Sequence, residues 1–152
     1  MSARYTIETT ADVALTAATA KTVLNYISAA NSPFVLVEFA VSFDGTSATA
    51  EPVTIELCYS TQGAAGTSTS QTPVQTGGTA RTVQGSGARN YSAEPTTLTC
   101  WKRWLVHPQT GIVMQFPLGR EPEQTVTADA LCLRVTAPAT LNCQAYMEIV
   151  EG

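Results

Sequence analysis

Two stretches in the first half of the chain alternate between apolar and polar side chains, and this period of two constrains the fold more than any other sequence feature. Successive side chains of a β-strand point to opposite faces, so residues 34–43 and 52–59 are each predicted to be strands with one buried face. Residues 44–51 between them are rich in turn-forming residues, and the two strands are therefore predicted to pair as a β-hairpin. The predicted buried face comprises Val35, Val37, Phe39, Val41, Phe43, Val53, Ile55, Leu57 and Tyr59.

The same alternation recurs along the chain and predicts about eight strands. Prolines or glycines lie in short connections at residues 31–33, 107–111 and 137–140, so most strands that are neighbours in sequence are expected to pair, including a second hairpin at the end of the chain. Eight antiparallel strands predict one all-β domain over residues 1–152, a β-sandwich or jelly roll in which the first and last strands pair. The predicted strands are residues 5–9, 22–27, 34–43, 53–60, 98–106, 112–116, 131–136 and 141–150.

The composition favours strands over helices and disfavours two classes of partner. Charged residues make up only 13% of the chain and threonine is frequent, which suits half-buried strands. The alanine-rich residues 11–21 contain β-branched residues and are interpreted as strand and turn instead of helix. The formal net charge is −4 and the basic residues are scattered, with only Lys102 and Arg103 adjacent, so neither nucleic acid nor an anionic membrane is expected as a partner.

No part of the sequence has the pattern of a targeting or membrane-spanning segment. A helix needs about 20 consecutive apolar residues to cross a bilayer, and the chain has no such run. Its first residues, MSARYT, lack the charged and then apolar pattern of a signal peptide. The chain is therefore expected to be made in the cytoplasm and to function without Sec export.

Residues 61–95 are the one long stretch without strand-like alternation. Their only sizeable apolar side chains are Val74, Val83 and Tyr91, so the stretch is expected to be a long loop that buries little surface. Two interpretations remain open, a solvated excursion without a ligand or a direct contact with a partner. A short strand near residues 79–83 is the element most easily missed here.

The four cysteines have no neighbour closer than eleven positions, so no C-x-x-C half-site for zinc or redox chemistry exists in the sequence. Without an export signal, free buried thiols are expected. The strand parities place Cys143 with the core residues and both Cys58 and Cys132 on the opposite face. One disulfide can form if two of the cysteine-bearing strands, including the one with Cys100, are neighbours.

The sequence contains no recognisable catalytic arrangement. Its single histidine, His107, precedes Pro108 in a predicted turn, where no third group would hold the imidazole against a nucleophile. The closest pair of carboxylates, Glu121 and Glu123, lies in a predicted loop instead of on rigid elements. No nucleotide-binding fingerprint is present. We therefore expect a protein that is not an enzyme, with no catalytic residue, cofactor or metal.

Trp101 and Trp104 lie three positions apart in a predicted strand, so they are predicted to point to opposite faces. One of the two would then leave the core side, either as an anchor of an interface or under a cover formed by the long loop. The outward stripe is predicted to be either Trp101, Arg103 and Leu105 or Cys100, Lys102 and Trp104. The candidates for an oligomer interface are Trp101, Arg103 and Trp104.

Three segments of the chain resemble a family of short proteins encoded by tailed bacteriophages: EFAVSFDGTSATAEPV at residues 38–53, VHPQTGI at residues 106–112, and ALTAATAKTVL at residues 14–24. The likeness runs through most of the chain and is weakest in residues 61–94. It implies a jelly-roll virion protein that decorates, or cements, the capsid exterior, commonly as a trimer on local three-fold positions. Its partners would be the major capsid protein and further copies of itself. Arg4 and Tyr5, near the N-terminus, are candidates for a capsid-facing arm.

Two other readings compete with a decoration protein. A jelly-roll head on a phage fibre would bind a receptor or glycan through residues 61–95 and an exposed aromatic side chain. A hydrolase would depend on His107, and no such activity is expected.

Overall fold

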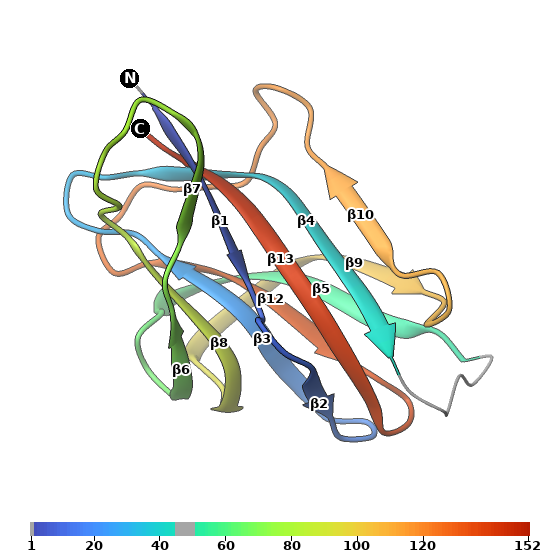
Figure 1. The fold of residues 1–152 in the computed structure, drawn as a ribbon. Helices are drawn as coiled ribbons and strands as arrows, with labels where there is room; N and C mark the ends of the chain where they lie inside the picture. Colours follow the sequence, from blue (N-terminus) through green and yellow to red (C-terminus); the bar gives the residue numbers. More distant parts are fainter. Residues whose placement is uncertain (1, 45–50) are drawn as a thin grey trace.

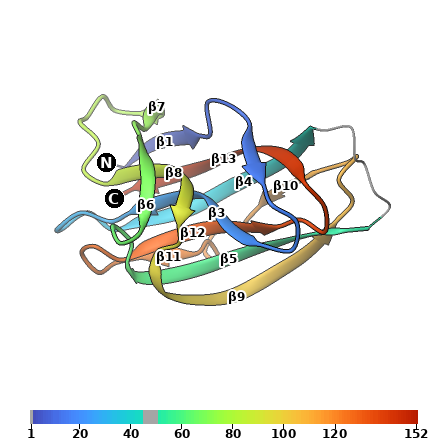
Figure 2. The same cartoon turned by 90° about the horizontal axis from the view of Figure 1, so that it is seen from below.

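Two antiparallel β-sheets pack face to face in the computed structural model, which describes residues 2–44 and 51–152 (Figures 1 and 2). The described residues contain no helix, which confirms the predicted all-β fold. Sheet A has the order β10-β4-β13-β1-β7, with β2 added on β13 and β11 on β4, and sheet B has the order β6-β8-β3-β12-β5-β9. Sheet A comprises β1 (Ala3–Glu8), β2 (Val13–Leu15), β4 (Phe34–Asp44), β7 (Val74–Gly78), β10 (Ile112–Gln115), β11 (Glu123–Gln124) and β13 (Leu141–Glu151). Sheet B comprises β3 (Ala20–Ile27), β5 (Val53–Gln62), β6 (Thr67–Gln71), β8 (Ser86–Ala93), β9 (Thr96–Val106) and β12 (Ala130–Thr136).

The eight strands predicted from the sequence correspond to β1, β3, β4, β5, β9, β10, β12 and β13. Within the sheets these eight have the orders β10-β4-β13-β1 and β3-β12-β5-β9. This is the strand order of a jelly roll, in which successive strands of the eight lie in opposite sheets except β5 and β9, which pair in sheet B. The alanine-rich residues 11–21 form β2, a turn and the start of β3, as predicted.

The predicted hairpins are wrong, because no two consecutive strands of the described chain pair with each other. β4 lies in sheet A and β5 in sheet B, and the same holds for β13 and β12, which were predicted to close the chain as a second hairpin. Alternation shows that each strand buries one face, but strands paired side by side and strands facing each other across a core satisfy it equally. Of the predicted turn of the first hairpin, residues 44–51, all but the two end residues lie outside the described residues.

The core lies between the sheets, and a β-bulge changes which residues of β4 face it. Glu148 pairs with Glu38 while Ile149 pairs with Leu36, so Val37 is an extra residue that no partner opposes. Phe39 and Val41 are buried as predicted, but on the other side of the bulge Phe34 and Leu36 enter the core in place of Val35 and Val37. The largest fully buried side chains are Tyr5, Tyr26, Phe34, Phe39, Ile7, Leu15, Leu24, Leu36, Ile55, Leu57, Leu131 and Leu133.

The first and last strands pair, as predicted, and β1 does so along its whole length. Ala3 pairs with Glu151 and Glu8 with Tyr146, and β1 is enclosed on its other side by β7. The two ends of the chain therefore lie close together at one end of the sandwich (Figure 1).

Residues 61–95 do not form the predicted loop. They contain β6 and β8, which extend sheet B beyond β3, and β7, which extends sheet A beyond β1 (Figure 2). The short strand expected at residues 79–83 is absent, since these residues connect β7 to β8 without strand pairing. The insertion thus widens both sheets on the same side of the sandwich.

Hydrogen bonds to buried polar groups hold this insertion, because its sequence provides few apolar side chains. The Asn25 amide of β3 donates to the Tyr91 hydroxyl at 2.8 Å and to the Gly63 carbonyl at 3.1 Å, and all three residues are buried where the insertion meets β3. Further along, the Glu94 carboxylate accepts hydrogen bonds from the backbone N–H of Thr22, at 2.6 Å, and from its hydroxyl. The Asn25 side-chain oxygen is buried without a partner, so it is the amide N–H groups and the Glu94 carboxylate that fix the geometry of this segment.

The buried Glu151 carboxylate, at the end of β13, holds the β7–β8 connection through hydrogen bonds. One carboxylate oxygen accepts hydrogen bonds from the Tyr26 hydroxyl at 2.6 Å and the Gly85 N–H at 2.7 Å, and the other accepts from the Gln84 N–H at 3.1 Å. Burial raises the pKa of Tyr26, and the hydrogen bond to Glu151 raises it further, so the phenol stays protonated and donates. Glu151, the last buried residue of β13, thus links Tyr26 of β3 to the β7–β8 connection, and this set of hydrogen bonds is called the Glu151 clamp below.

Replacing this donor tests how much the clamp contributes. Tyr26→Phe removes one of the three hydrogen bonds to a fully buried carboxylate, and we expect the free energy of unfolding to fall by about 1–3 kcal/mol. Tyr146→Phe is the matched control, because Tyr146 also donates to a glutamate, Glu38, but on the outer face of sheet A, and it should cost less than about 1 kcal/mol. Urea unfolding measures both values, and equal losses would contradict the assigned role of burial.

Candidate functional site at the β9 edge

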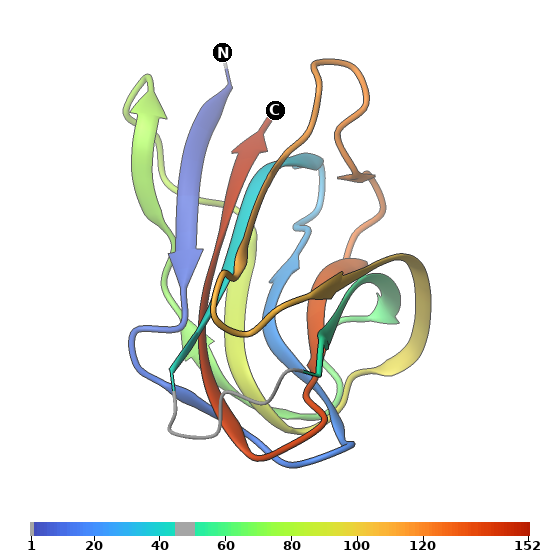
Figure 3. The same ribbon diagram turned by 90° about the vertical axis from the view of Figure 1, so that its right-hand side faces the viewer.

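β9 is the edge strand of sheet B and pairs only with β5, on the side of the molecule shown in Figure 3. A β-bulge interrupts this pairing, because Leu57 pairs with Lys102 while Cys58 pairs with Cys100. Trp101 is thus an extra residue, and the bulge moves the alternation of β9 by one position. The predicted opposite orientation of the two tryptophans is therefore wrong, since both Trp101 and Trp104 pack against the core.

Aromatic contacts close the side of the sandwich along β9. Trp101 stacks on Tyr59 with ring centroids 5.1 Å apart, and Trp104 meets Phe39 edge to face at 5.3 Å. The Lys102 ammonium group lies 5.5 Å from the Trp101 ring centroid and 5.1 Å from that of Phe116. A cation over the face of an aromatic ring is attracted by the π electrons, so Lys102 can cover these rings while its ammonium group keeps its charge. Both tryptophans thus serve the core more than a free surface.

The outer face of β9 carries Cys100, Arg103 and Leu105, a combination that matches neither predicted stripe. Of the three candidates for an oligomer interface, only Arg103 is exposed, with 67% of its side chain accessible. Leu105 beside it is 73% exposed, one of several exposed large apolar side chains of the chain. This outward pair joins an exposed charge to an exposed apolar side chain at the β9 edge.

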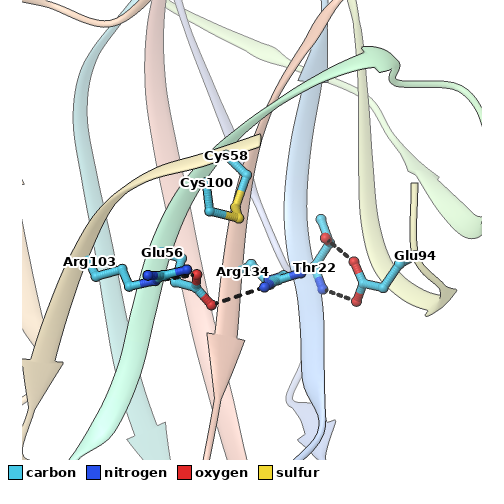
Figure 4. The surroundings of a disulfide bond; sticks show 7 residues. All are labelled: Thr22, Glu56, Cys58, Glu94, Cys100, Arg103 and Arg134. Atoms are coloured by element: carbon cyan, nitrogen blue, oxygen red, sulfur yellow. Dashed lines mark hydrogen bonds and ion pairs between the residues drawn. A yellow bond between two sulfur atoms is a disulfide. The ribbon is translucent and has the colours of Figure 1, made fainter. Parts of the chain in front are cut away.

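Glu56 joins β9 to the centre of sheet B (Figure 4). Its buried carboxylate accepts a hydrogen bond from Arg103 Nε at 2.7 Å and one from an Arg134 guanidinium nitrogen at 3.2 Å. Burial by itself would raise the pKa of Glu56, but the hydrogen bonds and charges of the two arginines outweigh it and hold the pKa below the ordinary value. Glu56 therefore stays ionised at neutral pH.

A disulfide joins Cys58 to Cys100 one step further along the same face (Figure 4). The expectation of free thiols is wrong for this pair, and the sequence spacing gave no signal for it because register, not sequence separation, brings the two residues together. Cys132 and Cys143 are free and buried, with Cys143 in the core and Cys132 on the outer face beside Cys58, as the strand parities predicted. Burial raises the pKa of each of these thiols to about 12.

A surface hollow of about 350 Å³ lies between β5, β9 and the segment that leads into β11. Rings of Tyr59 and Trp101 meet charged side chains there, and both members of the closest carboxylate pair line it. One of those carboxylates, Glu121, accepts a hydrogen bond from the backbone N–H of Gly119 at 2.6 Å. The lining residues are Val35, Tyr59, Trp101, Gly119, Arg120, Glu121, Pro122 and Glu123.

The N-terminal candidates lie within sheet A and not on a free arm. Tyr5 is only 2% exposed and donates a hydrogen bond to the Arg81 carbonyl at 2.9 Å, so its side chain is a core residue. Arg4 points outward, 49% exposed, and forms an ion pair with Glu148 at 3.1 Å. Of the two residues, Arg4 alone offers its side chain to a partner.

His107 lies in the turn between β9 and β10, where the structure gives it a local role. Its exposed imidazole accepts a hydrogen bond from the backbone N–H of Gln109 at 3.2 Å, and its carbonyl accepts from Thr110 and Gly111. These contacts are those of a turn residue, as predicted.

Comparisons of the chain with protein-family models, curated proteins and solved structures find no match. Among the described residues, no helix has the length and hydrophobicity that crossing a bilayer would require.

The Glu56 ion pairs predict a specific loss of stability in acid. Because the folded pKa of Glu56 lies below the unfolded value of about 4.3, its contribution is complete above that pH and is lost as the pH falls through the folded pKa. Glu56→Gln should therefore destabilise the disulfide-bonded chain by about 1–3 kcal/mol at pH 7 and by less near pH 3.

Urea unfolding at the two pH values measures this difference. Glu8→Gln is the control, because this exposed carboxylate at the end of β1 should change stability by less than about 0.5 kcal/mol at either pH. A Glu56→Gln loss that is independent of pH would show that shape, and not charge, accounts for the effect.

Proposed function

We propose that this chain is a non-enzymatic structural protein of a bacteriophage virion, which binds the outside of the capsid as a trimer and stabilises the shell. The observation that carries the proposal is the jelly-roll order of the eight long strands, an architecture used by viral capsid and lectin domains. A fold by itself does not specify a function. The resemblance of residues 38–53 and 106–112 to small phage proteins supports the choice of a virion role.

Physical chemistry is consistent with this role. A trimer on a three-fold capsid site engages three contacts at once, so each protomer needs little interface area while effective concentration holds the whole. If the capsid shell has an expanded and an unexpanded state, a protein that binds only the expanded state stabilises that state by mass action. The net charge of −4 suits a position outside a shell filled with DNA, because it gives the chain no attraction to the packaged polyanion.

Two outward-facing sites are the candidates for contacts under this proposal. Arg103 and Leu105 on the β9 edge combine an exposed guanidinium group with an exposed apolar side chain, and we assign them to the contact between copies. Arg4 on the outer face of sheet A is assigned to the capsid. Arginine is favoured at interfaces because its planar group pairs with carboxylates in a fixed geometry.

The hollow beside Trp101 favours one alternative, a jelly-roll head on a phage fibre that binds a glycan or receptor. Aromatic rings next to carboxylate and guanidinium groups are a combination that recognises sugars by stacking and hydrogen bonding. Packing of Trp101 on Tyr59 and under Lys102 leaves little free ring face for such stacking, which is why decoration is preferred.

Copy number in purified particles tests the proposal. A decoration protein should be present in amounts comparable with the major capsid protein, and adding the purified chain to stripped capsids should restore it to the sedimenting fraction. Quantitative mass spectrometry of the particles measures the first and cosedimentation the second. A few copies per particle would favour the fibre head, and a chain that is absent from particles would exclude both functions.

A charge introduced at the β9 edge tests the contact between copies. Leu105→Glu should convert the trimer to monomers, because an ionised carboxylate buried in an apolar contact is left without a partner. Val74→Glu is the matched control, since Val74 is 63% exposed on β7 at the opposite side of the sandwich and should leave the trimer intact. Light scattering coupled to gel filtration gives the mass of each species, and a Leu105→Glu chain that remains trimeric would contradict this assignment.

A further inference from the structure

Three cysteines form one row across three adjacent strands of sheet B. In the order β12-β5-β9, Cys132 pairs with Cys58, and Cys58 pairs with Cys100. Neighbouring strands lie about 4.8 Å apart, so Cys58 is adjacent to both of the other cysteines, whereas Cys100 and Cys132 are separated by two strand spacings. Cys58 is at the centre of the row, with a cysteine on either side.

A carboxylate lies beside this row. Glu56 is two residues before Cys58 on β5 and therefore points to the same face. A carboxylate oxygen of Glu56 and the sulfur atoms of Cys58 and Cys100 lie within 4.8 Å of one another (Figure 4). Sequence separation hides this cluster, because it is assembled by strand register alone.

The donor set suits a borderline-soft divalent ion. Zn²⁺ is bound by thiolate, imidazole and carboxylate ligands in a four-coordinate arrangement, and in structural zinc sites protein side chains fill all four positions. Cys58 and Cys132 are fully buried and Glu56 is 4% exposed, so a metal bound here would be shielded from water.

The two arginines that hold Glu56 would balance the charge of such a site. One divalent cation with two or three thiolates and a carboxylate carries a net negative charge, and Arg103 and Arg134 lie next to it. Each Glu56 oxygen accepts one hydrogen bond from an arginine and keeps a lone pair for a metal.

We propose that the chain with its disulfide reduced binds one Zn²⁺ ion through Cys58, Cys100 and Glu56, and that the Cys132 thiol, whose sulfur lies outside this 4.8 Å cluster, turns toward the ion as the fourth ligand. The disulfide-bonded chain is then the metal-free form of the same site. Reduction takes two electrons from a low-molecular-weight dithiol or two monothiols, which become a disulfide, while the Cys58–Cys100 bond opens to two thiols. Zn²⁺ binding then releases the thiol protons to solvent. In either form, β9 remains tied to β5.

The test uses the full chain reduced with a phosphine and titrated with Zn²⁺ or Co²⁺ under argon. We expect one metal ion per chain and, with Co²⁺, the sulfur-to-cobalt charge-transfer absorption of thiolate ligands in a tetrahedral arrangement. Cys58→Ser should weaken binding by more than about a hundredfold, and Cys132→Ser by about ten- to a hundredfold. The oxidised chain should bind no metal.

Cys143→Ser is the matched control, because Cys143 is also a buried free thiol but faces the core between the sheets. It should bind Zn²⁺ as tightly as the unaltered chain. Circular dichroism checks that each variant folds, and Cys100→Ser, at a half-buried edge position, replaces Cys58→Ser if the latter does not. A reduced chain that binds no metal, lacks the charge-transfer absorption, or keeps its affinity in the folded serine variants would overturn the proposal.

Discussion

The structure depends on one requirement, that every long strand bury its apolar face in a single shared core between two sheets. Consecutive strands such as β4 and β5 satisfy this requirement by facing one another across the core and not by pairing side by side. All the ladder hydrogen bonds then join residues far apart in the chain, such as Ala3 with Glu151. Such non-local pairing is typical of slow-folding β-sandwiches, since loops must close before their contacts stabilise the fold.

The sequence predicts the existence and the buried faces of the long strands, because a period of two is a local property of each strand. It does not predict strand partners, because pairing and facing leave the same pattern. Nor does it predict the bulges at Val37 and Trp101, each of which adds one residue and reverses the orientation of side chains beyond it. For this reason the predicted outward tryptophan is in fact a core residue, and the exposed pair is Arg103 and Leu105.

The insertion at residues 61–95 was underestimated for a different reason. Sequence patterns report apolar burial, whereas this segment is held by strand pairing and by hydrogen bonds to Asn25, Thr22 and Glu151, which are ordinary polar residues in the sequence. The same limit applies to the cysteine row. Spacing rules detect metal and redox sites whose ligands lie on one local loop, while Cys58, Cys100 and Cys132 are brought together by register between strands.

Pairing of β1 with β13 has a consequence for anything attached to this domain. Both strands run through the middle of sheet A, and Ala3 lies opposite Glu151 at one pole of the sandwich. A fused tag, cargo or further polypeptide at either end would leave the molecule at this same pole. The β9 edge runs along the far side of the sandwich. An attachment at either chain end would therefore lie away from β9, and the pole with the chain ends and the β9 edge can be used independently.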